Sequence, residues 1–257
     1  LAPSHLVIVY NDHMNYFDLK TYPTFAIGMA ERFPQADEGY GLRPFPGMVG
    51  DPEFSWPIAR ALVADGFDLT FCQELELDHG VYSWLPYLFD APWPVKVLPI
   101  AVNMLMQPVP TPQRLHALGA SLRRALLGDG RDSRVVVLAT GGMSHQIHGT
   151  RFGLTNEKWD RHFLDAIEND LDGLMAIPID EIMQIAGTEA GELSMWYAMR
   201  AALAASATAR SRRSAQASRS LRNTPRMSWA SSAGPMPRPT GWKPSVCATS
   251  TCKPSAC

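Results

Sequence analysis

Apolar, β-branched runs alternate with helix-forming segments through the first 203 residues, and this alternation constrains the fold more than any other feature of the sequence. The predicted strands are residues 6–10, 68–73, 95–102 and 134–140. The predicted helices are residues 52–65, 83–89, 111–127, 156–169, 179–186 and 188–203. Strands that alternate with helices are typical of a sheet covered by helices on both faces. We therefore predict an α/β fold with a mostly parallel or mixed central sheet.

One segment of the chain, residues 20–51, has no sustained period and holds five glycines and four prolines. Aromatic and aliphatic residues are scattered through it, and they need burial. We therefore predict a long ordered loop rather than a linker. Loops of this length usually border a functional site.

Charge divides the chain into two parts. Residues 1–203 carry 14 basic and 25 acidic residues, a net charge of −11, whereas residues 204–257 carry nine basic and no acidic residues. The acidic first part argues against a nucleic acid or an anionic membrane as a partner. The second part is rich in Ser, Ala and Pro and has two branched aliphatic residues, Leu221 and Val246, so we expect a disordered or out-of-frame tail.

Cysteine usage and hydropathy suggest a cellular location. No stretch reaches the roughly 20 apolar residues that a membrane span requires, and no secretory signal pattern opens the chain. Cys72 is alone in the first part and is typical of a small buried apolar residue. The spacing of Cys247, Cys252 and Cys257 could suggest a metal knuckle, but no His lies near them. We expect a cytoplasmic protein.

Four segments place metal-binding or titratable residues beside the ends of predicted elements. They are "YNDH", "ELDHG", "ATGGMSHQIHG" and "GTEAGELSMW", which contain His13, His79, His145, His148, Glu189 and Glu192. If the three strands that precede the His segments are parallel, their carboxyl ends meet at one sheet edge, where open α/β folds bind ligands. Imidazoles with a carboxylate suit a divalent metal, and two His with one carboxylate are typical of Fe(II) oxygenases.

Other chemistries match the sequence less well. Neither a phosphate-binding G-x-G-x-x-G loop nor a Walker A motif is present, and H-E-x-x-H is absent. Ser144 stands beside His145, but adjacent residues rarely form a nucleophile and base, and G-x-S-x-G is missing.

Several long motifs carry a resemblance to a known family. They are "VYNDHMNYFDLKTYPTFAIG", "ADEGYGLRPFPGMVGDPEF", "DHGVYSWLPYLFD", "PVKVLPIAVN", "TGGMSHQIHG" and "GELSMWYAMRAAL". Together they resemble the catalytic subunit of class III extradiol ring-cleaving dioxygenases, the family of gallate dioxygenase and of the beta subunit of protocatechuate 4,5-dioxygenase. The resemblance covers about residues 3–203 and implies a catalytic domain over residues 1–203.

The resemblance implies a role for each candidate residue. Fe(II) in this family is held by two His and one Glu, and the matching positions here are His13 and Glu192. The position of the catalytic acid and base matches His145. His79 corresponds to a residue that lines the substrate pocket, and Asn11 to a neighbour of the substrate ring.

The sequence departs from the family pattern at both ends. The first ligand His of the family belongs to a segment upstream of residue 1, and His5 is no substitute because it stands at the start of the strand that leads to His13. Glu189 is the nearest rival of Glu192, and we assign it to the first turn of a helix. We therefore expect this chain to be incomplete at its N-terminus and to bind Fe(II) poorly, with a tail in place of the family's C-terminal segment.

The resemblance implies an aromatic acid and O₂ as substrates. The "DHGVYSWLPYLFD" motif favours gallate, with protocatechuate or a methylated gallate as alternatives. A homodimer, or a small alpha-type subunit or domain that covers the site, is the expected assembly. Three other interpretations stay open: a zinc enzyme resembling amidohydrolases, an inactive fragment, and a member of the fold that only binds a metal or a protein.

Overall fold

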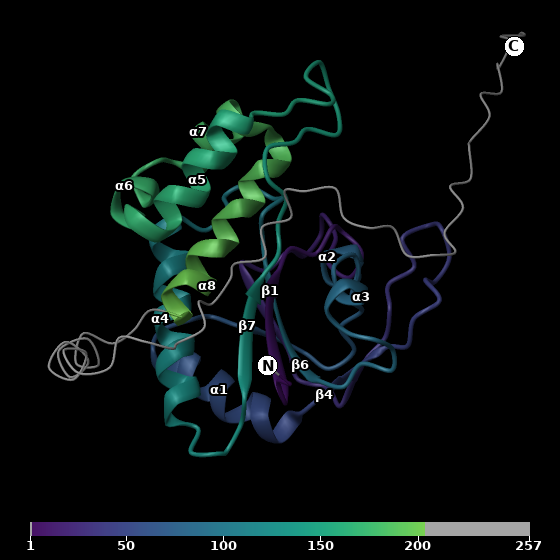
Figure 1. Ribbon diagram of the computed structural model, residues 1–257. Helices are drawn as coiled ribbons and strands as arrows, with labels where there is room; N and C mark the ends of the chain where they lie inside the picture. Colours follow the sequence, from purple (N-terminus) through teal and green to yellow (C-terminus); the bar gives the residue numbers. More distant parts are fainter. Residues whose placement is uncertain (1, 204–257) are drawn as a thin grey trace, which may run out of the picture. The chain divides into compact units, whose positions relative to one another are not determined.

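The computed structural model describes residues 2–203, and these residues form a mixed sheet of seven strands with helices on both faces (Figure 1). The strands are β1 (His5–Tyr10), β2 (Phe25–Gly28), β3 (Arg32–Phe33), β4 (Met48–Gly50), β5 (Thr70–Cys72), β6 (Lys96–Val102) and β7 (Val135–Ala139). The path β3-β4-β6-β1-β7 forms the main sheet, and β2 pairs with both β6 and β5. The predicted α/β fold is therefore confirmed.

The helices fill two layers. They are α1 (Pro52–Ala64), α2 (His79–Tyr82), α3 (Leu85–Leu88), α4 (Pro112–Gly128), α5 (Glu157–Asn169), α6 (Leu171–Met175), α7 (Ile179–Ala186) and α8 (Met195–Leu203), with a 3-10 helix η1 (Thr188–Ser194) before α8. Helices α1, α4, α5, α7 and α8 contribute to one apolar cluster, whereas α2 and α3 contribute to the other. Figure 1 shows α4, α5 and α8 on one side of β1 and β7, and α2 and α3 on the other.

Strand β1 is the centre of the core, because both of its faces are covered. Val7 and Val9 belong to the cluster with α1 and α4, and Leu6, Ile8 and Tyr10 belong to the cluster with α2 and α3. Successive side chains of a strand point to opposite faces. A strand buried on both faces therefore needs an uninterrupted apolar run, which is the pattern of residues 6–10.

Two sequence predictions need correction. Residues 20–51 are not a loop throughout, because β2, β3 and β4 lie within them. These strands have only two to four residues, so glycines and prolines between them hide any alternation. The helix predicted for residues 83–89 is present only as the short α3, and a separate short helix, α2, precedes the predicted range. The prediction for residues 204–257 concerns a tail outside the described residues.

Helix α1 begins at a charged cap that also joins the helix to the sheet. Asp51 accepts a hydrogen bond from the backbone N–H of Phe54, and its Oδ2 lies 2.7 Å from Lys96 Nζ and 3.1 Å from His5 Nε2. Burial alone would raise the pKa of Asp51, but the hydrogen bonds from Lys96 and His5 lower it from 3.8 to about 2. The charged carboxylate is therefore the form that stabilises the fold.

Replacing Asp51 with asparagine should destabilise the protein at neutral pH and much less in acid. A carboxyl whose pKa is lower in the folded state contributes stability above its unfolded pKa and loses it as the pH falls through the folded pKa. Asparagine keeps the cap, so the loss should be about 1 kcal/mol, as expected for a partly screened ion pair. Urea unfolding of both proteins checks this: the difference should shrink between pH 4 and pH 2, and a constant difference would contradict it.

None of the helices in residues 2–203 is long and apolar enough to cross a membrane.

Candidate metal and substrate site

Strand β1 ends at a tight loop that Asp12 organises. The Asp12 carboxylate accepts hydrogen bonds from the backbone N–H groups of Asn15, Tyr16 and Phe17. Burial raises the pKa of Asp12, and these three N–H groups lower it in part. A side-chain carboxylate that accepts hydrogen bonds from backbone N–H groups a few residues further on stabilises a tight loop, as the backbone carbonyl does in an ordinary turn. The loop therefore holds the next residue, His13, just beyond the end of β1.

His13 is fixed through both nitrogens of its ring. Its Nδ1 lies 2.9 Å from Asp78 Oδ2, which also accepts the His13 backbone N–H at 2.7 Å. Its Nε2 lies 2.9 Å from Glu192 Oε1. Burial alone would lower the pKa of His13, but these two carboxylates raise it to about 10. The ring is therefore held as a cation between two acids.

Glu192 lies in η1 and is buried, with 9% of its surface exposed. Asn11, the residue two before His13, donates from Nδ2 to Glu192 Oε1 at 3.1 Å. Burial alone would raise the pKa of Glu192, but the contacts with His13, Asn11 and the charge of His145 lower it. Asn11, His13 and Glu192 therefore meet at one place, and His145 lies near enough for its charge to act on Glu192.

His79 reaches the same site by a route that the sequence prediction had wrong. Strand β5 pairs in parallel with β2, and β2 pairs antiparallel with β6, so β5 runs opposite to β1 and β7. The chain after β5 returns to the site edge, and the His79 and His13 ring centroids lie 3.9 Å apart. Glu38 holds His79 Nδ1, and Arg43 Nη1 lies 2.5 Å from Glu38 Oε2.

His145 follows β7 across two glycines. Its Nδ1 lies 2.7 Å from the backbone oxygen of Met143, and its ring packs over Gly142. His148 is exposed and pairs with Glu189 at 2.8 Å, and Glu189 also accepts the backbone N–H of Ile147. Glu189 lies in the first turn of η1, as predicted, and it additionally anchors the loop that carries His145.

Two sets of residues could hold a metal ion at this edge. Ligand atoms of His13, Asp78 and His79 all lie within 4.8 Å of one another. However, Asp78 Oδ2 already accepts from the backbone and ring of His13 and from Asn15 Nδ2, and its Oδ1 accepts from Gly80 N–H. A buried carboxylate that is saturated in this way orients its neighbours and has little capacity for an ion.

His13 and Glu192 fit a divalent ion better. An ion bonded at about 2.1 Å to each of two atoms at a right angle holds those atoms about 3 Å apart, and the observed Nε2–Oε1 distance is 2.9 Å. The ion would take the place of the proton on Nε2. Asp78 on Nδ1 then completes the carboxylate–histidine–metal arrangement that is common at metal sites. His13 and Glu192 therefore supply two of the donor types that a divalent metal takes, an imidazole nitrogen and a carboxylate oxygen.

Sequence reasoning missed the carboxylates that support this site. Asp78 stands directly before His79, and its pairing with His13 links positions 65 residues apart. Glu38 is 41 residues from His79 in the sequence. Neither residue carries a local signal of its role, because each contact depends on how distant segments meet.

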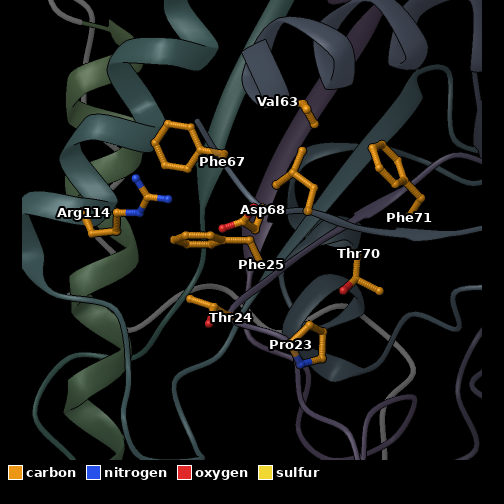
Figure 2. Close-up of a pocket in the computed structure, with 10 residues that line it drawn as sticks. Pro23, Thr24, Phe25, Val63, Phe67, Asp68, Thr70, Phe71 and Arg114 are labelled. Carbon is orange, nitrogen blue, oxygen red and sulfur yellow. The ribbon is translucent and has the colours of Figure 1, made fainter. Parts of the chain in front are cut away.

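A hollow of about 610 Å³ lies elsewhere, at the β2–β5 end of the sheet (Figure 2). Its lining includes Phe25, Phe67, Phe71 and Arg114, and the Arg114 guanidinium lies 4.1 Å over the Phe67 ring. Arg114 also donates to the backbone oxygen of Gly66. None of the predicted site residues lines this hollow, and the Arg114 contacts are those of a stacked structural cation.

Comparisons with known proteins place the chain in one family. Residues 1–227 match the family model described as LigB, the catalytic LigB subunit of aromatic ring-opening dioxygenase. The chain is 40% identical over 172 residues to a gallate dioxygenase of Pseudomonas putida, a match that covers 66% of this chain and 51% of that protein. The chain therefore spans about half the length of that relative.

Two further relatives are more distant. A Pseudomonas putida protein named 2,3-dihydroxyphenylpropionate/2,3-dihydroxicinnamic acid 1,2-dioxygenase 2 is 26% identical over 252 residues, covering 79% of this chain and 77% of that protein. The crystal structure of the uncharacterized protein JW3007 from Escherichia coli K12 superposes with a TM-score of 0.50 at 14% identity, over 79% of this chain and 76% of that one. That likeness concerns the fold alone. Because the family model covers most of the sequence, the chain belongs to the LigB family of aromatic ring-opening dioxygenase catalytic subunits.

Proposed function

We propose that this chain catalyses the extradiol cleavage of a catechol-type aromatic acid by O₂, with Fe(II) as its metal. One observation carries the proposal: in a LigB-family chain, His13 Nε2 and Glu192 Oε1 face each other at 2.9 Å at the sheet edge where His79 and His145 also lie. In this proposal residues 1–203 form the catalytic domain.

His13 and Glu192 would hold the metal. Bound Fe(II) supplies a template for the adjacent substrate oxygens and for O₂, and a path for electron density between them. Asp78 fixes the His13 ring through Nδ1, and Asn11 fixes Glu192 through Oε1. These contacts hold both ligand atoms toward the same point before any ion arrives, which reduces the cost of ordering them.

His145 is the proposed acid and base. A hydrogen bond from Nδ1 to the Met143 carbonyl leaves Nε2 free to accept a proton from a substrate hydroxyl and to return it later. His79, held by Glu38 against the His13 ring, is the proposed wall of the substrate pocket, and Asn11 the neighbour of the substrate ring.

Gallate is the proposed substrate, because the 40% identity to a gallate dioxygenase supports it among catechol-type acids. Protocatechuate and a methylated gallate are the alternatives. A cytoplasmic location and a homodimer, or a small subunit or domain over the site, are part of the same proposal. The zinc-enzyme, inactive-fragment and metal-binding interpretations remain its rivals, and each predicts that the protein consumes no oxygen with gallate.

Oxygen uptake tests the function directly. After anaerobic loading with Fe(II), the protein should consume O₂ when gallate is added, and the ring absorbance of gallate should disappear in equal amount. A phenol acid with one hydroxyl serves as the control, because it lacks the adjacent pair of oxygens. Uptake with neither compound, or equal uptake with both, would contradict the proposal.

Replacing Gly142 with alanine should disable His145 with little loss of stability. A Cβ at this position would lie 2.6 Å from His145 Cε1, so the ring must move and break its bond to the Met143 carbonyl. We expect the rate of gallate cleavage to fall about 10-fold or more, because acid–base catalysis depends on placement of the base. Gly128→Ala is the control, since among the described residues a Cβ there would meet no atom within 4 Å beyond its own helix backbone and chain neighbours. Similar rates for both variants would contradict this placement of His145.

A further inference from the structure

One peptide group connects His145 to Asp160, an acidic residue that has no role in the proposed site described above. The backbone oxygen of Met143 lies 2.7 Å from His145 Nδ1. The N–H of the same peptide group belongs to Ser144 and donates to Asp160 Oδ1 at 2.8 Å. Asp160, one peptide group and the imidazole therefore form a continuous chain of hydrogen bonds.

The geometry of a peptide group couples its two ends. A trans peptide is planar, and its C=O and N–H point in opposite directions. When Asp160 fixes the direction of the Ser144 N–H, it also fixes the direction of the Met143 carbonyl. A negative charge at one end of such a chain further polarises the peptide and strengthens the bond at the other end. The carboxylate therefore acts on His145 although it does not touch the ring.

Asp160 is well placed to act as an anchor. Its Oδ2 accepts a second hydrogen bond from Ser144 Oγ at 2.8 Å, so both of its oxygens hold the same residue. Ser144 is buried, and its Oγ accepts the backbone N–H of Asn156, which caps helix α5. Asp160 itself lies in the first turn of α5, and α5 is packed into the core through Trp159 and Phe163.

We propose that Asp160 is a positioning residue that fixes His145 in the tautomer with its proton on Nδ1. Nδ1–H donates to the Met143 carbonyl, and Nε2 keeps the lone pair that takes the substrate proton. The proposal rests on the role of His145 in the proposed function. It deepens that function by naming the group that decides which ring nitrogen is the base.

The tautomer itself is measurable in the metal-free protein, without any turnover. Nitrogen-15 spectra of the imidazoles at about pH 8, above the ordinary His pKa, distinguish a protonated from an unprotonated ring nitrogen. The signals that vanish in His145→Gln belong to His145. We expect a protonated Nδ1 and an unprotonated Nε2 in the wild-type protein. A protonated Nε2 there would overturn the proposal, whatever the variants do.

Asp160→Asn tests the role of the carboxylate. Asparagine keeps the shape of the side chain and can still accept the Ser144 N–H, but it removes the negative charge that polarises the Met143–Ser144 peptide group and weakens the bond at its other end. We expect a mixture of His145 tautomers and a kcat for gallate about 10-fold lower, with KM changed less than 3-fold, because proton transfer and not substrate binding is affected. Asp165→Asn is the matched control on the same helix, because within residues 2–203 the exposed Asp165 carboxylate accepts a side-chain hydrogen bond only from Asn169.

Ser144→Ala separates the two bonds that Asp160 makes. The variant loses the bond from Ser144 Oγ and keeps the backbone N–H, so the His145 tautomer should stay as in the wild-type protein. A wild-type tautomer and kcat in a folded Asp160→Asn protein would overturn the proposal. Failure of the proposed function has a different result: the protein would not cleave gallate, while the nitrogen-15 spectra would still report on Asp160.

Discussion

Replacing Glu192 with alanine should remove most of the Fe(II) affinity that this chain has. Glu192 is one of the two ligands proposed for Fe(II), and its removal also leaves His13 Nε2 and Asn11 Nδ2 without their shared partner. Changes to residues that only support a metal ligand commonly cost about 10 to 100-fold in affinity, so removal of a ligand itself should cost more than about 100-fold. Anaerobic calorimetry with Fe(II) measures this loss.

Glu189→Ala is the control for this experiment. Glu189 lies in the same 3-10 helix and contacts His148 and the backbone of Ile147, but it makes no contact with His13. Its Fe(II) affinity should stay within a few-fold of that of the wild-type protein. If Glu192→Ala bound Fe(II) as tightly as the wild type, or if Glu189→Ala lost binding equally, the assignment of the ligands would be wrong.

Replacing His145 with glutamine should remove catalysis and leave metal binding intact. General acid–base catalysis by a placed side chain typically contributes about 100 to 10,000-fold, and glutamine cannot accept and return a proton at neutral pH. His145 affects Glu192 only electrostatically and is not one of the proposed metal ligands. We therefore expect kcat for gallate to fall by at least about 100-fold while the Fe(II) affinity stays unchanged.

His162→Gln is the matched control, because His162 is an exposed histidine of α5 away from the site. It should retain wild-type kcat and wild-type Fe(II) affinity. Equal kcat for His145→Gln and His162→Gln would show that His145 is not the acid and base. A loss of Fe(II) binding in His145→Gln would show instead that His145 is a ligand.

The parts of the fold that carry a strong local pattern could be predicted from the sequence. Strand β1 has apolar residues on both faces, and that uninterrupted run identified it as a buried strand. Helices α4 and α5 begin at side-chain caps, Thr111 and Asn156, and their predicted limits agree with the structure within one residue. Pattern and cap are both properties of neighbouring residues, so no knowledge of the fold was needed.

The parts that depend on how strands pair could not be predicted in this way. Strands β3 and β4 have two and three residues, too few to show an alternation, and they exist because β4 pairs with β6. The direction of β5 is set by its pairing with β2, a strand that the sequence prediction did not contain. His79 reached the predicted place because the chain after β5 turns back to the site edge.

The same distinction between local pattern and distant contact applies to the residues of the candidate site. The sequence singled out His13, His79, His145 and Glu192 because His and Glu beside the ends of elements are conspicuous and match a family motif. Asp78, Glu38 and Asp160 act through contacts with residues far along the chain or through a peptide group. The chain contains 25 Asp and Glu residues, and nothing in the local sequence distinguishes those that support the site from those at the surface.

In the proposed reaction, both atoms of one O₂ molecule are incorporated into the ring-opened product of a catechol-type acid. Gallate turnover under ¹⁸O₂, followed by mass spectrometry of the product within seconds, tests that claim most directly. The proposal predicts a ring-opened product that carries label from O₂ in both new oxygen positions, formed by the wild-type protein and absent with Glu192→Ala. An unlabelled product, or a labelled product formed equally by Glu192→Ala, would contradict it.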